Sequence, residues 1–492
     1  MKINKYLPTI LIILIILIGA FFRLYRIREY MIFLGDEGRD VLVVKRMLID
    51  HKFTLLGPIT SVGSMYIGPI YYYFMAPFLF LFRFDPVGPA VMVALFSIAT
   101  IWLIYYLTRQ YLSTRSALIS SFLYAISPLT IIQGRSSWNP NIVPFFSLLI
   151  IYGLLKTVVD KKYGYLLLVG LAFGICVQLH YISLMFIPII ICSLLLLKFK
   201  LPLKYYFYLC GGFLLTWSPF LAFEIRHEFT NIRAVINFLS FGGKSSVLGL
   251  SAIFSTMSDI LIRLFWRLVV IESAEMTKLL LVFLSLGLGL YYYRSKNKPP
   301  ALAILFIWFF IGLLSFGLYK GIIYDYYMVP LFALPFILTG IFLDNIWKMK
   351  NKGMIISILV LLILTYFNLK KNPLLSEPNN LLQNSQDISR FVFTKIDHQP
   401  YNFALLAGRN SDHAYRYFLE LWGNPPVPIE NPTIDPERKT VQSLLYIVCE
   451  EKECHPLGHP LWEIAGFGRA EIQGDWKVST ARVFKLVHFK SK

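Results

Sequence analysis

The sequence predicts a mainly α-helical, polytopic membrane bundle of about 11 to 13 spans, followed by a small C-terminal α/β domain outside the cytoplasm. Three observations predict this class: few charges, long uncharged runs, and positive charge between the runs. Of the 492 residues, 57% are apolar and only 15% are charged. A soluble protein carries about 25% charged residues because its surface is solvated, so most of this chain must face lipid. Disordered, collagen-like and small disulfide-rich proteins are excluded.

The first apolar run covers residues 6–22 and follows Lys2 and Lys5. We interpret it as a first membrane anchor because no A-x-A cleavage site follows and further spans do. Ten more runs of spanning length follow, at 86–107, 116–133, 141–159, 163–180, 181–197, 205–223, 277–293, 301–319, 325–343 and 353–369. The stretch 67–83, with two prolines and three adjacent tyrosines, is expected to lie at the interface. Residues 254–271 carry two arginines and are ambiguous for the same reason. Counting both of these stretches as spans gives the upper count.

The basic loops test this count through the positive-inside rule. With a cytoplasmic N-terminus, five loops face the cytoplasm and all are basic: 109–115, 156–162, 198–204, 294–298 and 348–352. Twelve of the 14 acidic residues before position 373 then fall outside. The pattern therefore predicts a multi-pass plasma-membrane protein with a cytoplasmic N-terminus and an extracytoplasmic C-terminal segment.

A change in charge balance marks the C-terminal domain. Residues 373–492 contain 13 Lys and Arg against 14 Asp and Glu, whereas residues 1–372 carry the remaining net charge of +20. This shift predicts a domain boundary at residue 372. The C-terminal part has strand-like runs and one helix-like run, as expected of a small α/β domain, at 403–408, 443–450, 482–488 and 413–422.

Two cysteines of this domain have two interpretations. Cys449 and Cys454 lie where disulfides persist, so they predict a local bridge. With His455 and His459 they also form a possible metal cluster, although the spacing matches no standard zinc site.

The first outside loop carries the most informative acidic residues. Asp36 and Glu37 follow the first span directly and precede an amphipathic stretch, RDVLVVKRML, at 39–48. One interpretation makes Asp36 the N-cap of the helix that follows. Glu37 is equally interpretable as an exposed residue of the first helical turn.

The order of these features resembles a known family. An Asp-Glu pair after the first span, an amphipathic stretch, and then Pro69-Ile70-Tyr71-Tyr72 resemble the C-type (GT-C) membrane glycosyltransferases. More closely, the pattern is similar to the dolichyl-phosphate-mannose protein mannosyltransferase and aminoarabinose transferase group. The resemblance implies a transmembrane catalytic domain over 1–372 and an extracytoplasmic domain over 373–492. It also implies an inverting enzyme that transfers a sugar from a polyprenyl phosphate, undecaprenyl or dolichyl, to a protein, lipid or glycan acceptor at the extracytoplasmic face.

The family's first-loop aspartate corresponds to Asp36, which the resemblance makes the catalytic residue. One carboxylate suffices for an inverting transfer, because it takes the acceptor's hydroxyl proton while the phosphate leaves. A retaining hydrolase would need two opposed carboxylates. Some relatives carry Lys-Pro before the Tyr stretch, and this chain has Gly68-Pro69 instead, so a donor contact copied from those relatives is in doubt.

The remaining candidates would bind the donor phosphate and sugar. A leaving phosphate needs cations aimed at its developing charge. Arg135 is the best placed, in an outside turn with Asn139, although a snorkelling arginine is an equal interpretation. His180 and Tyr324 lie in two further outside turns, where an interfacial histidine and an aromatic belt are the plain alternatives. The cations that the topology places outside the cytoplasm are Arg39, Lys45, Arg46, Arg135, Arg226, Arg233, Arg263, Arg267 and Lys320. The residues predicted to bind the donor are Glu37, Arg39, Arg135, Asn139, His180 and Tyr324.

No cofactor is required with certainty, and a divalent metal beside Glu37 is allowed. The long outside loop 224–275, with GGK at 242–244, is expected to cover the site. The expected partners are the lipid-linked donor, its acceptor and membrane lipids. Nucleic acid is excluded because the positive charge follows span ends instead of forming one face. Two other functions stay open: an oligosaccharide polymerase or ligase with a diphosphate-linked donor, and a transporter or flippase of lipid-linked sugars.

Overall fold

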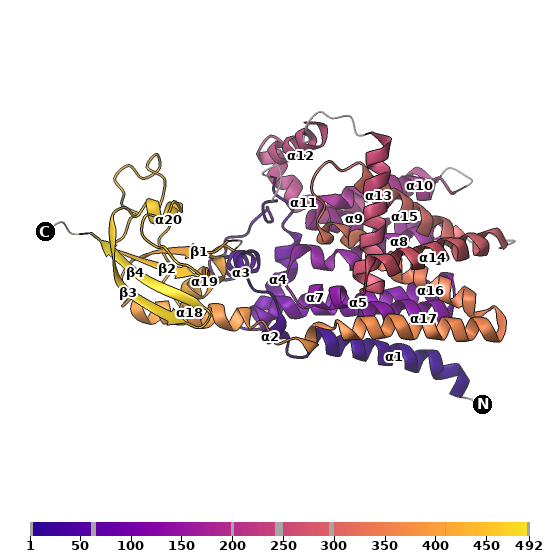
Figure 1. The fold of residues 1–492 in the computed structure, drawn as a ribbon. Helices are drawn as coiled ribbons and strands as arrows, with labels where there is room; N and C mark the ends of the chain where they lie inside the picture. The colour runs from indigo at the N-terminus through magenta and orange to yellow at the C-terminus, as the bar shows by residue number, and fades with distance from the viewer. Residues whose placement is uncertain are drawn as a thin grey trace. The chain divides into compact units, whose positions relative to one another are not determined.

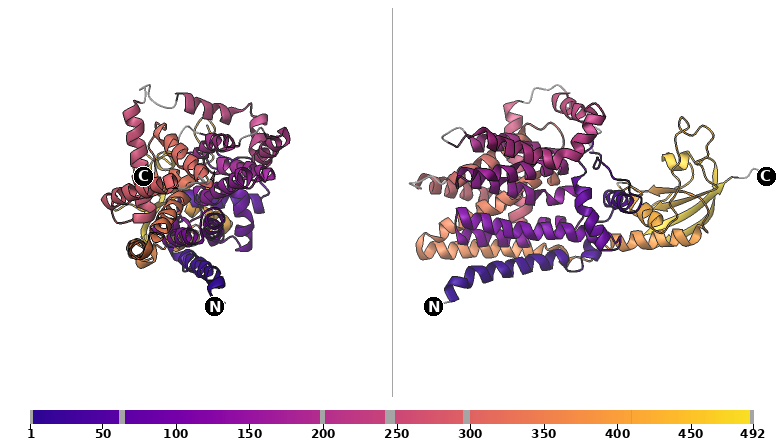
Figure 2. Two further views of the ribbon diagram at one scale, coloured as in Figure 1. Left: turned by 90° about the vertical axis from the view of Figure 1, so that its right-hand side faces the viewer. Right: turned by 180° about the vertical axis from the view of Figure 1, so that it is seen from behind.

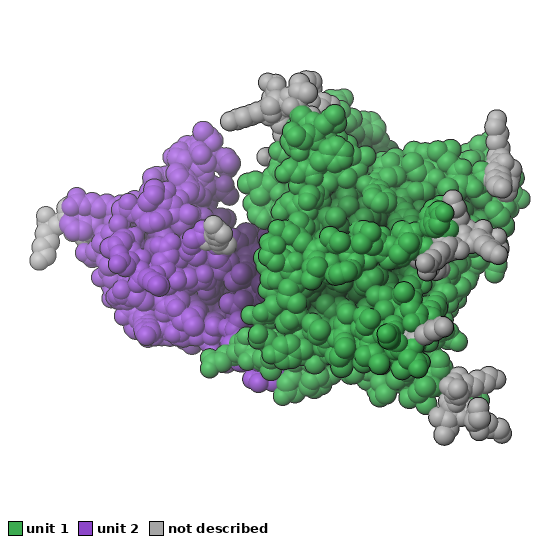
Figure 3. Space-filling model, turned by 45° about the vertical axis from the view of Figure 1, so that its right-hand side comes forward, with its two compact units in different colours: residues 1–25, 53–74, 90–377 green, residues 26–52, 75–89, 378–492 purple. Residues whose placement is uncertain are grey.

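The computed structural model describes residues 3–60, 65–197, 201–241, 249–294, 300–408 and 410–489 (Figure 1). The stretch 242–244 and parts of the basic loops 198–204 and 294–298 lie outside this range. The chain divides into two compact units (Figure 3). Unit 1 comprises Met1–Tyr25, Phe53–Phe74 and Ala90–Glu377, and unit 2 comprises Arg26–Lys52, Met75–Pro89 and Pro378–Lys492. Two early segments, including the loop with Asp36, thus belong with the C-terminal residues.

The regular elements of unit 1 are all helices among its described residues, and an isolated β-bridge pairs Ile59 with Tyr66 (Figures 1 and 2). Every run that the sequence predicts to span coincides with one helix or with two consecutive helices. These are α1 (Ile3–Leu24), α5 (Val87–Tyr111), α6 (Thr114–Ile126), α7 (Pro128–Gln133), α8 (Val143–Val158), α9 (Leu166–Leu179), α10 (Phe186–Leu194), α11 (Leu203–Arg226), α14 (Ala274–Arg294), α15 (Pro300–Gly317), α16 (Ala333–Trp347) and α17 (Lys350–Lys370). Between them lie α12 (Thr230–Phe241), α13 (Leu250–Phe265) and short helices η1 (Asn139–Ile142), η3 (Tyr181–Met185), η4 (Trp266–Val270) and η5 (Asp325–Leu331).

Helix length reduces the number of candidate spans. Among the described residues, six helices are long and apolar enough to cross a membrane, or seven if the bent pair of η5 and α16 is one span. Several predicted runs break into shorter pieces, as where Pro128 starts a new helix. Helix α9 has 14 residues and rises about 21 Å, less than the roughly 30 Å of a hydrocarbon core. The stretch predicted to lie at the interface forms α4 (Ile70–Leu81), with 12 residues.

A buried arginine joins four helices of unit 1. Arg23, at the end of α1, is fully buried. Its guanidinium donates to the Ser97 hydroxyl at 2.7 Å, to the Ala125 carbonyl at 3.0 Å and to the Thr130 hydroxyl at 3.1 Å. A charge buried in a membrane bundle persists only when such partners satisfy it. Arg23 therefore has a structural role.

Unit 2 contains a four-stranded sheet of order β1-β2-β4-β3. Strand β1 (Asn402–Leu406) is parallel to β2 (Leu444–Cys449), and β4 (Ala481–His488) is antiparallel to both β2 and β3 (Ala470–Val478). Residues of β1 alternate between two cores: Phe403 packs with helices α18 (Leu381–Lys395) and α19 (His413–Leu421), while Ala404 packs on the other face. The small C-terminal sheet is thus confirmed. The sequence missed β3, none of whose residues is buried.

The two cysteines of unit 2 form the predicted disulfide, Cys449–Cys454. Their sulfurs are bonded to each other and are not thiolate ligands, so the alternative Cys-His metal cluster is wrong.

Candidate active site

Asp36 lies in the first turn of α3 (Gly35–Ile49), within unit 2. The N-cap position is Leu34, so the interpretation of Asp36 as the N-cap is wrong. Other groups satisfy the free backbone amides: the Glu37 carboxylate accepts from Leu34 N–H at 3.0 Å, and Asn410 Oδ1 accepts from Gly35 N–H at 2.9 Å. The Asp36 side chain is 57% exposed. Its carboxylate is therefore available to a ligand and lies where the helix dipole favours negative charge.

Arg39 stands beside this carboxylate in a fixed orientation. Its Nη1 lies 2.9 Å from Asp36 Oδ1, while its Nε and Nη2 donate to Asp40 Oδ1 at 2.9 Å and 2.8 Å. Asp40 is fully buried, and the two bonds to its Oδ1 fix the orientation of the guanidinium. The predicted candidates Asp36 and Arg39 are thus brought together one turn apart.

Glu37 points into unit 2 and is only 6% exposed. Burial raises the pKa of its carboxyl to about 7, while the Leu34 N–H bond acts to lower it and the charges of Asp36 and Asp40 raise it further. The expectation that Glu37 is an exposed helix-start residue is therefore wrong. Its hydrogen bond to Leu34 holds the start of α3, and contact with a metal or donor remains a prediction.

The raised pKa predicts how local stability depends on pH. The neutral carboxyl is favoured in the fold, so its contribution is complete below the ordinary pKa of 4.5 and is lost as pH rises through about 7. Glu37→Gln should remove this dependence and should stabilise α3 above pH 7 by roughly 3 kcal/mol relative to the wild type. Hydrogen exchange of α3 amides between pH 5 and 9, corrected for intrinsic rates, measures it.

The matched control for Glu37→Gln is Glu437→Gln, at an exposed carboxylate of the same unit that pairs with Lys439. It should retain the wild-type pH dependence. Identical pH profiles for wild type and Glu37→Gln would contradict a buried titrating Glu37.

A second group of candidates meets within unit 1. His180, at the end of α9, lies with its ring centroid 5.0 Å from Tyr327 and 5.9 Å from Tyr326. Tyr326 also lies 4.6 Å from Trp138 and stacks on Tyr324 at 5.7 Å. We name these five residues the aromatic cluster. Three turns that are distant in sequence, at the starts of η1, η3 and η5, therefore bring these rings into contact.

Asn139 binds the backbone next to the aromatic cluster. Its Nδ2 donates to the Leu179 carbonyl at 2.6 Å, which ties the start of η1 to the end of α9, directly before His180. The side chain is buried. Asn139, His180 and Tyr324 thus lie in one region of unit 1, where the Asn139 amide binds the backbone. Their contact with a donor remains a prediction.

The cations beside the aromatic cluster are Arg263 and Arg267, whereas the sequence had favoured Arg135. Asp325, next to Tyr324, accepts from Arg263 Nη2 at 2.7 Å and from Arg267 Nε at 3.0 Å. Arg263 Nη2 also donates to the Ile323 carbonyl at 3.0 Å. Their spacing of four residues on one helix face is the sequence signal that could have singled them out.

Arg135 is 1% exposed and binds the end of α1. Its Nη1 donates to the Phe22 carbonyl at 2.6 Å and its Nη2 to the Tyr25 carbonyl at 2.7 Å. The last carbonyls of a helix lack intrahelical partners, so this guanidinium provides hydrogen bonds that cap the C-terminal end of α1. The geometry favours a structural role, and binding of a phosphate by Arg135 remains a prediction.

Arg135→Ala separates the two roles of this residue. If Arg135 caps α1, the variant should lose about 1 to 3 kcal/mol of stability, because the hydrogen bonds from the charged guanidinium to the α1 carbonyls are lost. The donor KM should then not change. Thermal unfolding and donor KM are measured together, with Arg109→Ala at the end of α5 as the control. A raised KM at unchanged stability would instead support a phosphate contact.

Gly68, which stands before Pro69 and the Tyr stretch, is closely packed. A Cβ added to Gly68 would lie 2.3 Å from Gln178 Cγ and 2.5 Å from Gln178 Oε1. A lysine at this position therefore requires Gln178 to move.

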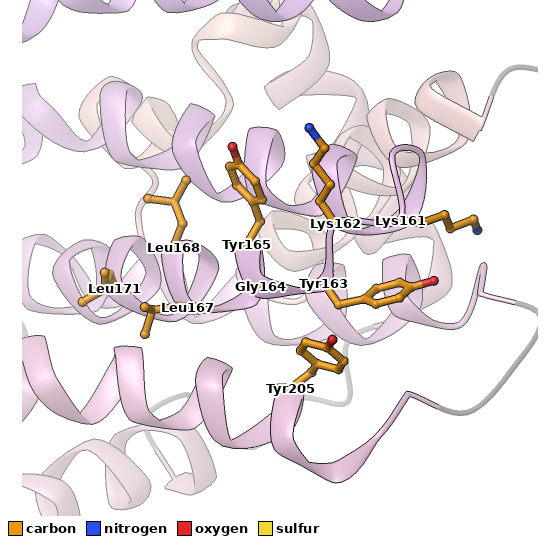
Figure 4. Close-up of a pocket in the computed structure, with 9 residues that line it drawn as sticks. All are labelled: Lys161, Lys162, Tyr163, Gly164, Tyr165, Leu167, Leu168, Leu171 and Tyr205. Carbon is orange, nitrogen blue, oxygen red and sulfur yellow. The ribbon is translucent and has the colours of Figure 1, made fainter.

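Two further features bear on ligands. Within the described ranges, no three His, Cys, Asp or Glu side chains lie close enough together to hold a metal ion. A pocket of about 560 Å³ lies beside the start of α9, at the opposite end of that helix from His180 (Figure 4). It is lined by Lys161, Lys162, Tyr163, Gly164, Tyr165, Leu167, Leu168, Leu171 and Tyr205. None of these is a predicted site residue.

Comparison with known proteins identifies the fold. Residues 67–223 match the sequence model of the family described as dolichyl-phosphate-mannose-protein mannosyltransferase. The chain is similar to ArnT from Cupriavidus metallidurans in the apo state, with 14% identity, a TM-score of 0.65, and coverage of 99% of this chain and 98% of that chain. The structure of that ArnT bound to undecaprenyl phosphate matches with 13% identity, a TM-score of 0.65 and 97% coverage of each chain.

A third solved structure is the apo form of the oligosaccharyltransferase from Archaeoglobus fulgidus. It matches with 12% identity, a TM-score of 0.52, and coverage of 94% of this chain and 71% of that chain. No curated protein matches this sequence significantly. At these identities the likeness shows the fold, so the predicted C-type (GT-C) fold is confirmed.

Proposed function

We propose that this protein is an inverting glycosyltransferase that moves a sugar from a polyprenyl phosphate to an acceptor hydroxyl at the extracytoplasmic membrane face. The observation that carries the proposal is the fold shared along nearly the whole of both chains with ArnT, one structure of which holds undecaprenyl phosphate. The partial family match over residues 67–223 supports the same chemistry.

The reaction assigns one role to Asp36. The acceptor oxygen attacks the anomeric carbon, the bond from that carbon to the phosphate oxygen breaks, and the phosphate leaves with the electron pair. The hydroxyl proton passes to the exposed Asp36 carboxylate, which Arg39 orients. A single base is sufficient for inversion.

Two groups of side chains are proposed to bind the donor. Arg263 and Arg267 are proposed to hold the phosphate, because two guanidinium groups match its oxygens and neutralise the charge that develops as it leaves. The aromatic cluster, with His180 and Tyr324, is proposed to stack against the sugar. A divalent metal remains a prediction, as does the cytoplasmic N-terminus.

Transfer from defined donors tests the proposal. The purified protein in lipid nanodiscs is given undecaprenyl-phosphate-linked sugars with lipid, peptide or glycan acceptors, and mass spectrometry follows released undecaprenyl phosphate and glycosylated product. We expect stoichiometric release and product with one acceptor class. Absence of both with every monophosphate donor would overturn it.

An oligosaccharide polymerase or ligase is the second candidate, favoured by the match to the Archaeoglobus oligosaccharyltransferase. Use of a diphosphate-linked oligosaccharide, without use of monophosphate donors, distinguishes it. Translocation of a lipid-linked sugar without any product would indicate a transporter.

A further inference from the structure

The first turn of α3 packs against the segment 410–414 of the C-terminal sequence, within unit 2. A Cβ added to Gly35 would lie 2.0 Å from Ser411 Oγ, and one added to Gly38 would lie 2.3 Å from the Ala414 backbone nitrogen. Only glycine permits so close an approach. The turn that carries Asp36 therefore lies with its backbone directly on this segment.

Asn410 makes the polar contact at this packing surface. Its Oδ1 accepts from Gly35 N–H and from Ser411 N–H, both at 2.9 Å. The bond to Gly35 satisfies an amide of the first turn, next to Asp36 in sequence. The position of the Asp36 backbone is thus linked to the orientation of one amide side chain, 375 residues away from Gly35.

Glu450 fixes which way that amide points. Its two carboxylate oxygens accept from Asn410 Nδ2 at 3.0 Å and 3.1 Å, so Oδ1 must face Gly35. Glu450 is itself held: the Tyr415 hydroxyl donates to it at 2.5 Å, and its own N–H donates to the Leu406 carbonyl at 2.9 Å. The disulfide Cys449–Cys454 begins at the preceding residue.

We propose that Asn410 is a positioning residue for the Asp36 carboxylate, that Glu450 orients it, and that the C-terminal domain serves to hold the first turn of α3. The inference rests on the proposed function, since it assigns to Asn410 an effect on the same transfer. It differs from a role in acceptor binding alone, because Asn410 acts through Gly35 and touches no reacting atom.

Single variants of Asn410 and Glu450, and a double variant that exchanges their amide and carboxylate groups, test this proposal. Asn410→Ala removes the bond to Gly35 and should lower kcat about ten- to a hundredfold with little change in KM, since small misplacement of a reacting group has effects of this size. Asn410→Asp places two carboxylates face to face and should be as impaired. Glu450→Gln should stay near wild type, because the carbonyl oxygen of the introduced amide still accepts from Asn410 and Tyr415.

The double variant Asn410→Asp with Glu450→Gln should recover most of the lost kcat. The aspartate oxygens accept from Gly35 and Ser411, and the glutamine amide donates to the aspartate, so the bonds are restored with donor and acceptor exchanged. The control is Asn431→Ala, because the Asn431 side-chain oxygen also accepts from a backbone N–H, that of nearby Thr433. It should leave kcat unchanged.

Hydrogen exchange of residues 35–38 gives a readout that does not depend on catalysis. Asn410→Ala and Asn410→Asp should exchange at least tenfold faster there, the double variant should approach wild type, and β2 and β4 should keep their protection. If the wild type transfers no sugar, the proposed function fails while the exchange pattern still tests the contact. Unchanged kcat and unchanged exchange in Asn410→Ala would overturn the inference, as would loss of protection throughout unit 2 without recovery in the double variant.

Discussion

Asp36→Asn is expected to lower kcat for glycosyl transfer by about 10² to 10⁴-fold, the usual contribution of a general base. The amide cannot accept the hydroxyl proton, yet it has the same shape and its oxygen still accepts from Arg39 Nη1. The side chain is mostly exposed and satisfies no buried partner, so the fold should persist. Initial rates of polyprenyl-phosphate release and the thermal unfolding temperature measure both parts.

Asp50→Asn provides the matched control for Asp36→Asn. Asp50 is the C-cap of the same helix and lies 3.7 Å from Lys45, so this variant also removes one negative charge from α3. It should transfer sugar within about twofold of the wild type, because Lys45 keeps its closer partner Glu420, at 3.2 Å. A properly folded Asp36→Asn protein that retains turnover would eliminate Asp36 as the base.

The double variant Arg263→Ala with Arg267→Ala is expected to raise the donor KM by at least about a hundredfold, because hydrogen bonds between charged groups are worth about 1.5 to 3 kcal/mol each. Each single variant should show part of this effect. Asp325 holds both guanidinium groups, so Asp325→Asn should raise KM less, by loosening their positions. Titration of the donor at saturating acceptor concentration measures KM and kcat separately.

Lys278→Ala tests whether loss of any cation in this part of unit 1 has the same effect. Lys278 lies near the start of α14 and pairs with Glu275 at 2.8 Å, within its own helix. Its removal should leave KM unchanged. If the donor KM of the double arginine variant equals that of the wild type, other residues bind the phosphate, and Arg135 is again a candidate phosphate ligand.

Sequence features that act locally predicted much of the protein. A span is recognised by its own apolar residues, and all eleven predicted runs are helical. The Cys449–Cys454 bridge joins residues five apart, so their proximity follows from the chain itself. The context of Asp36, an acidic pair between a span and an amphipathic stretch, is likewise a feature of consecutive residues.

Features that depend on distant partners were predicted poorly. Glu37 has the sequence position of an exposed helix-start residue, and only its packing within unit 2 makes it a buried group with a raised pKa. Arg135 has the sequence position of a snorkelling or phosphate-binding residue, yet it completes α1, more than a hundred residues earlier. No local pattern contains such information.

Composition and periodicity alone therefore establish a helical membrane protein with a C-terminal α/β domain and an acidic first loop, because hydrophobicity and charge act residue by residue against lipid and water. Tertiary structure alone assigns the partners. It joins the first loop to the C-terminal sequence through Asn410 and Glu450, and it sets Arg263 and Arg267 against Asp325. A hydrogen bond needs its two atoms within about 3 Å, and folding decides which distant residues meet that condition.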